Sequence, residues 1–254
     1  MRRRIVALLL ALTLILSFTG ALCYDVSSYA DNTIIIAYTE DTNFVTYENG
    51  IFSGYGVEFL DEISLYAKWH YKLLPCTRAT ALRGLDNGTI DLYVGTSDTD
   101  SLNDEYLISD NSIMTVSSLI YVRPDDDRIY YNDYKNLDGM TIGFKGTNTL
   151  SDKFSDFAAA SGFSYSARFY TSYEMLHQAL LKGEIDAIST SSLVPFTDCK
   201  LVSNYSAGGY YVLASKKHPN IMAKFNEAYE LINSRSPGFI KVNQFFSQVF
   251  TFFA

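Results

Sequence analysis

The chain has 254 residues, 48% of them apolar and 19% charged, so it can bury a hydrophobic core and is not a disordered acidic tail. Its net charge of −8 argues against binding to nucleic acid or to anionic membranes, because both depend on clusters of Lys and Arg. Aromatic residues make up 15%, including 20 Tyr, which suits either a site that grips a small solute or the ordinary packing of strands.

The first 23 residues predict a secretory signal peptide. Basic residues stand at positions 2–4, an apolar run covers residues 5–18, and small residues follow at 19–21. An uncleaved membrane anchor and lipidation at Cys23 stay open as alternatives. All three interpretations export the rest of the chain, to the periplasm or the extracellular side, with or without an N-terminal membrane anchor.

Beyond the leader, strand-like and helix-like segments alternate. We expect helices at residues 56–68, 77–85, 150–160, 171–182 and 221–232, with Thr77 and Thr171 as caps and Glu174 completing a capping box. Pro124 and the acid run at 125–127 predict a turn. Strands separated by helices indicate βαβ units on parallel sheets, that is, an α/β fold. The expected strands are residues 33–38, 71–74, 90–94, 116–122, 140–144, 164–169, 185–189 and 210–214.

One segment of the chain is repeated. Residues 85–91 (LDNGTID) resemble residues 180–186 (LLKGEID), and in both copies a strand and a capped helix come before and a strand follows. Such turns also occur by chance, because Gly ends many helices. With the similar flanks, the repeat predicts two related α/β lobes. Ligands of open α/β sheets bind beyond the carboxyl ends of strands, where these copies continue into Gly95-Thr96 and Thr190-Ser191.

The sequence shows no pattern of an enzyme, metal site or cofactor site. Its three His residues belong to no metalloprotease motif, and it has neither a nucleophile elbow nor a phosphate-binding loop. The run Asp98-Thr99-Asp100 lacks the Gly and the spaced Glu of an EF-hand. Cys76 and Cys199 follow the leader, and they are either free thiols or a disulfide. We therefore predict no catalysis, no metal and no cofactor.

In the order of its parts, the chain resembles the bacterial extracellular solute-binding proteins of family 3, which have the type 2 periplasmic-binding fold. The resemblance implies two α/β lobes with a hinge and a cleft between them. Lobe 1 would comprise residues 24–122 and, on return, 195–254, and lobe 2 would comprise residues 123–194. The likeness spans residues 33–232 and rests on the stretches 34–38, 43–47, 54–60, 78–91, 136–143 and 173–186.

The resemblance implies a monomeric protein that captures a small polar ligand, amino-acid-like or otherwise, for uptake through the membrane permease of an ABC transporter. An alternative is the ligand-sensing ectodomain, or a fragment of one, of a membrane signalling protein such as a sensor kinase or a diguanylate cyclase. Its partner would then be a signalling domain. A surface protein that no longer binds a ligand is a third possibility.

Two departures from the family pattern concern the ligand. Amino-acid binders of the family hold the α-carboxylate with an Arg after the third strand, but residues 96–105 contain none. They hold the α-ammonium with an acid near the position of Ser191. A zwitterionic α-amino acid is therefore not expected. The acids in residues 98–105 would favour a cationic or neutral solute, unless this run is simply a solvated loop.

The resemblance also implies a set of ligand-binding residues. Arg78 would either reach into the cleft or pair with an acid. Residues 145–149 follow a strand and open a helix, where backbone N–H groups can hold an anionic or carbonyl group. The predicted ligand-binding residues are Tyr38, Phe44, Tyr47, Arg78, Gly95 and Thr96 in lobe 1, and Lys145, Gly146, Thr147, Asn148, Tyr170 and Ser191 in lobe 2.

Overall fold

The computed structural model describes residues 33–39, 42–97, 99–146 and 149–240. The predicted signal peptide at residues 1–23 and the C-terminal residues 241–254 lie outside the described residues. The described residues from Ile34 onward form one compact unit. Within the described ranges, no helix is both long enough and apolar enough to cross a membrane.

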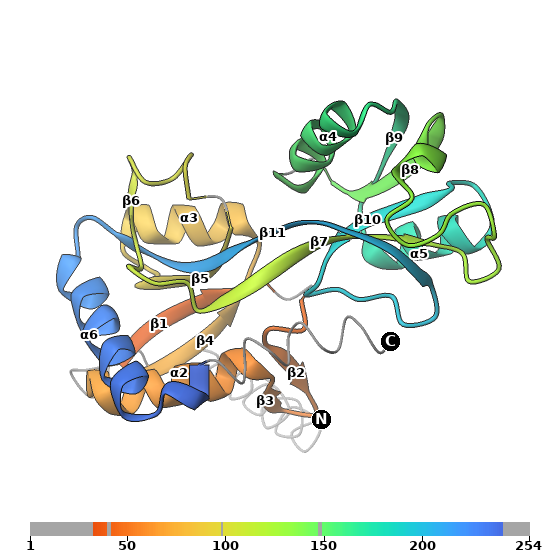
Figure 1. Cartoon of the computed structure of the whole chain (residues 1–254). Coiled ribbons are helices and arrows are strands. Elements are labelled where there is room, and N and C mark those ends of the chain that lie inside the picture. Colours follow the sequence, from red (N-terminus) through yellow and green to blue (C-terminus); the bar gives the residue numbers. More distant parts are fainter. Residues whose placement is uncertain (1–32, 40–41, 98, 147–148, 241–254) are drawn as a thin grey trace, which may run out of the picture. The chain divides into compact units, whose positions relative to one another are not determined.

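Lobe 1 is a sheet packed with helices. Its strands β1 (Thr33–Tyr38), β4 (His70–Pro75) and β5 (Leu92–Thr96) lie in the order β4-β1-β5, and β1 runs parallel to β5. The helices are α2 (Tyr55–Ala67), α3 (Arg78–Asn87) and α6 (Pro219–Arg235), of which α2 and α6 lie against each other (Figure 1). The sequence did not predict the short hairpin β2 (Thr46–Glu48) and β3 (Ile51–Ser53) or the strand β6 (Tyr106–Ile108).

Lobe 2 has the same kind of construction. Its strands β8 (Met140–Lys145), β9 (Tyr165–Tyr170) and β10 (Ala187–Ser191) are parallel, with β8 in the middle. Helices α4 (Thr149–Ser161) and α5 (Tyr173–Leu181) connect them, and a short 3₁₀ helix, η2 (Tyr134–Leu137), precedes β8. The predicted βαβ units are therefore present in both lobes.

Two long strands take part in both lobes. β7 (Met114–Val122) and β11 (Lys200–Ser215) pair with each other in antiparallel orientation, side by side in Figure 1. β11 also pairs with β5 of lobe 1, and β7 with β10 of lobe 2. The sheet order is β4-β1-β5-β11-β7-β10-β8-β9, with β6 paired to β11.

The predicted strand at residues 210–214 is only the last part of β11. The strand begins at Lys200, ten residues earlier, and passes through Asn204, Gly208 and Gly209, which resemble a loop in sequence. Pairing with β7 holds this segment in an extended conformation. The pairing register shifts twice, between Leu201 and Ser203 and between Asn204 and Ser206. The sheet is mixed, because the parallel strands predicted for each lobe are joined through β7 and β11, which are antiparallel to each other.

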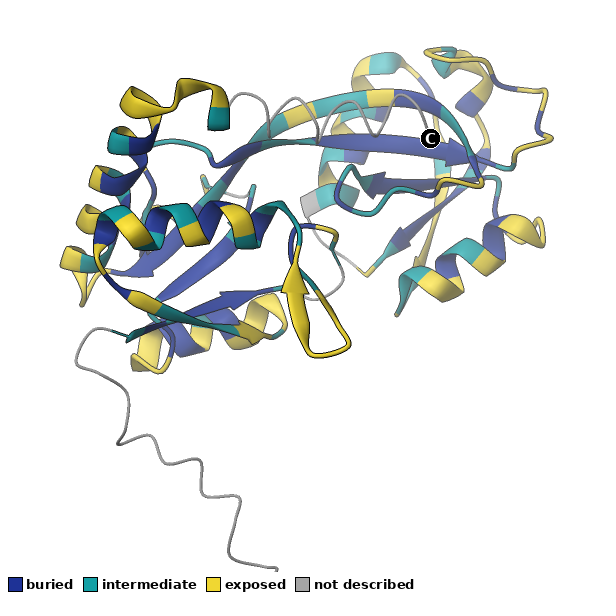
Figure 2. Ribbon diagram, turned by 90° about the horizontal axis from the view of Figure 1, so that it is seen from below, coloured by how far each residue is buried: buried dark blue, intermediate teal, exposed yellow. Residues whose placement is uncertain are grey.

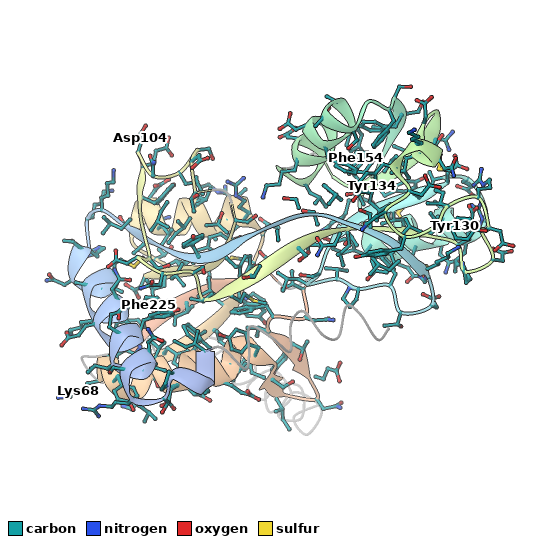
Figure 3. All side chains as sticks on the ribbon, viewed as in Figure 1. Lys68, Asp104, Tyr130, Tyr134, Phe154 and Phe225 are labelled. Atoms are coloured by element: carbon teal, nitrogen blue, oxygen red, sulfur yellow. The ribbon has the colours of Figure 1, made fainter. Side chains whose placement is uncertain are left out.

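Each lobe has its own hydrophobic core. In lobe 1, Phe59 and Phe225 are fully buried where α2 meets α6. In lobe 2, Phe154 is fully buried with Tyr134 packed against its cluster; Figure 3 labels both, together with Phe225. Figure 2 shows the pattern that results, with the central strands buried and the β2–β3 hairpin exposed.

The internal repeat is confirmed by matching hydrogen bonds. In lobe 1, Asp91 N donates to Ile35 O at 2.9 Å, and Asp91 Oδ2 accepts from Ile35 N at 2.7 Å. In lobe 2, Asp186 N donates to Thr141 O at 2.9 Å, and Asp186 Oδ2 accepts from Thr141 N at 3.0 Å. Ile35 lies in β1 and Thr141 in β8. Each Asp therefore links the residue just before its own strand, β5 or β10, to the parallel neighbour of that strand, β1 or β8.

Of the two predicted helix caps, Thr77 is confirmed and Thr171 is wrong. Thr77 caps α3, since its side chain accepts a hydrogen bond from Thr80 N. The cap of α5 is Ser172 rather than Thr171, and its Oγ accepts from Met175 N at 3.2 Å. Glu174 is thus the second residue of the helix and cannot form the predicted capping box, which requires the third.

The acid run 125–127 forms the predicted turn, but one of its carboxylates is buried. The Asp126 side chain is 2% exposed and accepts from Arg128 Nε at 3.0 Å and Arg128 Nη2 at 2.7 Å. Arg123 approaches the same carboxylate at 3.5 Å, and Arg128 also reaches Asp186 at 3.0 Å. The turn is therefore held by a cluster of charges. Cys76 and Cys199, left open above, are not joined by a disulfide.

Candidate ligand-binding site

The predicted residues of lobe 1 gather at the carboxyl edge of its parallel strands. Tyr38 is the last residue of β1, and Thr96 is the last residue of β5. Because Tyr38 lies opposite Val94, both strands end at the same edge. Tyr38 and Thr96 are buried, with only 2% and 4% of their surface exposed. This edge is where open α/β sheets bind ligands.

Arg78 lies at the same edge, at the first position of α3. Burial raises the pKa of Tyr93, whereas its hydrogen bond with Thr39 and the nearby positive charge of Arg78 act against this rise. The hydroxyls of Tyr93 and Thr39 are 3.2 Å apart. Thr39 and Tyr93 were not among the predicted ligand-binding residues, although Thr39 directly follows a strand that was correctly predicted.

Gly95 has a conformation and surroundings that exclude a side chain. Its φ of 130° is strained for any other residue, and a Cβ atom would collide with the hydroxyl of Tyr210. Tyr210 is buried, which raises the pKa of its hydroxyl. Its ring packs edge-to-face on Phe44 at 5.6 Å. Phe44 is 2% exposed in the core of lobe 1, so it has little surface to offer a ligand.

Tyr47 lies on the β2–β3 hairpin, whose Phe52 contacts the ring of Tyr38 edge-to-face at 6.3 Å. It is 59% exposed, and its ring contacts Phe52 at 4.5 Å. Ile51 of the same hairpin is also exposed. Sequence alone could not place Tyr47, because the hairpin has strands of only three residues.

In lobe 2 the predicted residues again share a carboxyl edge. Lys145 and Tyr170 end β8 and β9 and lie directly opposite each other. The Lys145 ammonium is 5.1 Å from the ring centre of Tyr173, a cation–π contact. Gly146 N donates to Tyr170 O at 2.9 Å, so this N–H is already used within the protein. Thr147 and Asn148 lie outside the described residues.

Ser191 ends β10 at the same edge of lobe 2 and pairs with Ser118 of β7. The next residue, Ser192, exchanges hydrogen bonds with Ser117: its Oγ accepts from Ser117 N at 3.0 Å, and its N donates to Ser117 O at 2.8 Å. The strand ends here in a group of hydroxyls rather than in a carboxylate. The position where the family pattern has an acid is thus small and polar.

The described part of the acid run after β5 is a solvated turn. Leu102 is buried and anchors it, and the amides of Leu102 and Asn103 both donate to Thr99 O. The acids Asp104 and Glu105 are exposed, and Figure 3 labels Asp104 at the surface. Of the two interpretations left open above, the solvated loop fits these residues.

Comparisons with known proteins identify the fold. The model of the bacterial extracellular solute-binding proteins, family 3, matches residues 34–236. A search of curated proteins found no match. A mutant of ArgBP from T. maritima superimposes with a TM-score of 0.67 at 19% identity, covering 84% of this chain and 93% of that chain.

Two further solved structures are similar. A second substrate-binding domain of a putative amino acid ABC transporter from Streptococcus pneumoniae has a TM-score of 0.63 at 17% identity, covering 87% of this chain and 100% of that chain. An ancestral amino acid-binding protein, described as a precursor of cyclohexadienyl dehydratase, has a TM-score of 0.69 at 17% identity, covering 84% and 93%. The predicted fold class, type 2 periplasmic-binding-protein-like with two α/β lobes, is confirmed.

Proposed function

Because this chain belongs to the bacterial extracellular solute-binding proteins of family 3, we propose that it is an exported protein that captures a small polar ligand for uptake by an ABC transporter. The observation that carries the proposal is the gathering of predicted residues at one carboxyl edge in each lobe, Tyr38 and Thr96 in the first and Lys145 and Tyr170 in the second. In this proposal the two edges hold the same ligand, and the lobes close around it through a hinge.

The side chains at the two edges favour a ligand with an anionic or strongly accepting group. Arg78 belongs to the first edge and Lys145 to the second, and both carry donors that suit a carboxylate. Tyr170, which is partly exposed, adds aromatic surface, and Ser191 offers a hydroxyl where an α-ammonium would need an acid. We therefore propose an organic acid or a neutral polar solute rather than a zwitterionic α-amino acid.

We propose binding rather than catalysis at these edges. The groups gathered there are hydroxyls, aromatic rings, one guanidinium and one ammonium, which bind and orient a ligand. None of these residues supplies a carboxyl group that could act as a general acid near neutral pH. Delivery to a membrane permease, action as a monomer, and the domain boundaries given above are parts of the same proposal.

A thermal-shift screen tests the proposal. The purified chain is heated with organic acids, sugars, amines, amino acids and peptides. A ligand at 100 times its Kd adds about 2.7 kcal/mol of stability. For a protein of this size, that raises the melting temperature by roughly 5–10 °C.

Arg78→Gln removes the charge of a predicted site residue, and Arg83→Gln, which removes another exposed charge of the same helix, is the matched control. The proposal predicts that the shift given by the ligand is lost in Arg78→Gln and kept in Arg83→Gln. A shift with α-amino acids alone would contradict the proposed ligand class. An equal shift in both variants would contradict the proposed site, and no shift across the panel would contradict solute binding.

A further inference from the structure

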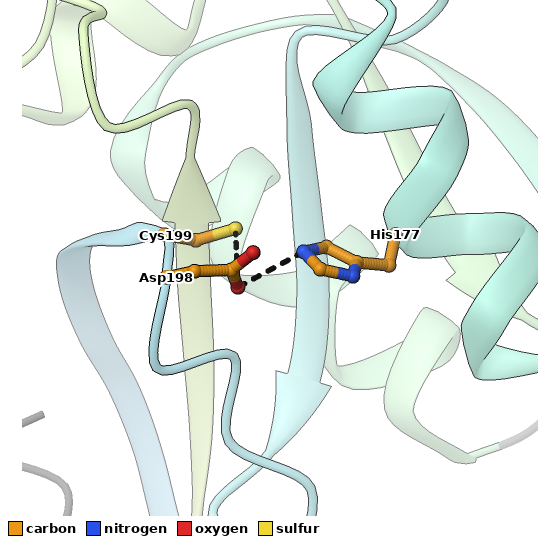
Figure 4. A group of neighbouring side chains, drawn as sticks. All are labelled: His177, Asp198 and Cys199. Carbon is orange, nitrogen blue, oxygen red and sulfur yellow. Dashed lines mark hydrogen bonds and ion pairs between the residues drawn. The ribbon is translucent and has the colours of Figure 1, made fainter.

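Three metal-ligating side chains that belong to none of the predicted ligand-binding residues meet beside helix α5 of lobe 2. His177 lies in the middle of α5, whereas Asp198 and Cys199 directly precede β11. The His177 Nε2 atom is 3.0 Å from Asp198 Oδ1, and the Cys199 sulfur is 3.8 Å from the same oxygen. All three ligand atoms lie within 4.8 Å of one another (Figure 4).

The local backbone conformation lets the neighbouring side chains of Asp198 and Cys199 point in the same direction, toward His177. In a strand, successive side chains point to opposite faces, so Asp198 and Cys199 could not share a ligand there. Here they lie in a turn, closed by the hydrogen bond from Cys199 N to Phe196 O at 3.2 Å. The turn lets the carboxylate and the sulfur both face the helix that carries His177, as Figure 4 shows.

The cluster lies beside a buried aromatic side chain. The His177 Nε2 atom is buried, and its partner is the Asp198 carboxylate at 3.0 Å. The rings of His177 and Tyr121 both pack on Phe196, His177 at 4.9 Å and Tyr121 at 5.9 Å. Packing therefore holds the imidazole in place, with its Nε2 atom directed at the carboxylate.

The three donors are the ones that zinc prefers. Zn²⁺ binds imidazole nitrogen, thiolate sulfur and carboxylate oxygen, with bonds that place tetrahedral ligands roughly 3.3–3.8 Å apart. The distances of 3.0 Å and 3.8 Å in the cluster are close to this range. Cys199 is buried, whereas the Asp198 side chain is 57% exposed, so solvent reaches the carboxylate side of the cluster.

We propose that His177, Asp198 and Cys199 bind one Zn²⁺ ion, with water as the fourth ligand. The Cys199 thiol loses its proton to solvent as the sulfur–zinc bond forms, and the imidazole binds in its neutral form. The bound ion would join α5 to the segment that leads from β10 into β11. This segment includes the predicted lobe boundary between residues 194 and 195, so zinc would restrain the chain close to that boundary.

The experiment uses Co²⁺ as a spectroscopic substitute for Zn²⁺, titrated into the full chain. Cys23→Ser is the background, so that the leader cysteine does not contribute. We expect one Co²⁺ per chain, a charge-transfer absorption that reports a sulfur–cobalt bond, and loss of this absorption when Zn²⁺ displaces the cobalt. Co²⁺ that binds without this absorption would overturn the proposal, as would the absence of binding.

Four variants locate the site. Cys199→Ser is expected to abolish the charge-transfer absorption, and His177→Gln and Asp198→Asn each to weaken Co²⁺ binding by roughly tenfold or more. Cys76→Ser is the matched control and should leave both readouts unchanged. The opposite result, with the absorption lost in Cys76→Ser and kept in Cys199→Ser, would overturn the proposal. If Cys199→Ser fails to fold, the substitution of the exposed Asp198 by Asn tests the site instead. Unchanged affinity of Asp198→Asn for Co²⁺ would refute the proposed site.

Discussion

Asp126 offers the sharpest test of how lobe 2 is held together. Its side chain is 2% exposed, and it accepts hydrogen bonds from the main chain of Arg128 at 3.0 Å and from the guanidinium at 3.0 Å and 2.7 Å. These bonds are the first cause that lowers the pKa of the Asp126 carboxyl from its usual value, against the opposing effect of burial. Asp126→Asn keeps the shape of the side chain but removes its charge.

We expect Asp126→Asn to destabilise the protein by about 2 kcal/mol. A hydrogen bond to a charged group contributes about 1.5–3 kcal/mol, and the Asn oxygen can retain part of the contact with Arg128. Arg128 is half exposed and can be solvated in the variant, so the larger penalty of a fully buried lone charge does not apply. The melting temperature should fall by roughly 4–8 °C.

The stability difference must also depend on pH. Because the folded-state pKa of Asp126 lies below its unfolded value of about 3.9, its contribution is fully present above that value and is lost as the pH falls through the folded pKa. Urea unfolding of wild type and variant at several pH values measures this. Exposed Asp127→Asn is the control. A difference below about 0.5 kcal/mol at pH 7, or one that persists unchanged through acid pH, would refute the reasoning.

Further stability predictions concern the backbone, a cap and a core, and urea unfolding measures each. Gly95→Ala forces a side chain into a φ of 130° and against Tyr210, so a loss of about 1–3 kcal/mol is expected, and an unaffected variant would show that Tyr210 moves freely. Thr77→Ala removes the cap of α3 and should cost about 1 kcal/mol; no loss would mean that the cap is not used in solution. Leu176→Ala, fully buried, should cost about 2–5 kcal/mol, whereas Leu181→Ala, 41% exposed on the same helix, should cost much less; equal losses would contradict the packing described.

The parts of the fold that sequence predicts are those governed by local patterns. The Thr77 cap and the two Ile-Asp turns lie in short segments whose residues dictate their own geometry. The first half of β11 could not be predicted, because its small polar residues become a strand only by pairing with β7. The cap of α5 was misplaced by one residue, since Thr171 and Ser172 are both good caps in sequence and only the helix start distinguishes them.

The candidate site was predictable to a similar extent. Residues that end a strand, such as Tyr38 and Lys145, follow from the strand prediction, since parallel strands share a carboxyl edge. Phe44 and Tyr47 were both predicted from the family resemblance, and sequence could not show that the fold buries the first and exposes the second. The cluster of His177, Asp198 and Cys199 has no sequence spacing that marks it, because a helix and a distant turn supply its members.

Isothermal titration calorimetry tests directly whether residues of both lobes hold one solute. A ligand found by the thermal screen is titrated into wild type, Arg78→Gln and Lys145→Gln, with the exposed Lys182→Gln as a control. We expect one ligand per chain, a loss of affinity of roughly tenfold or more in Arg78→Gln and in Lys145→Gln, and unchanged binding in Lys182→Gln. Wild-type affinity in either Arg78→Gln or Lys145→Gln would contradict this expectation, because one edge would then play no part in binding.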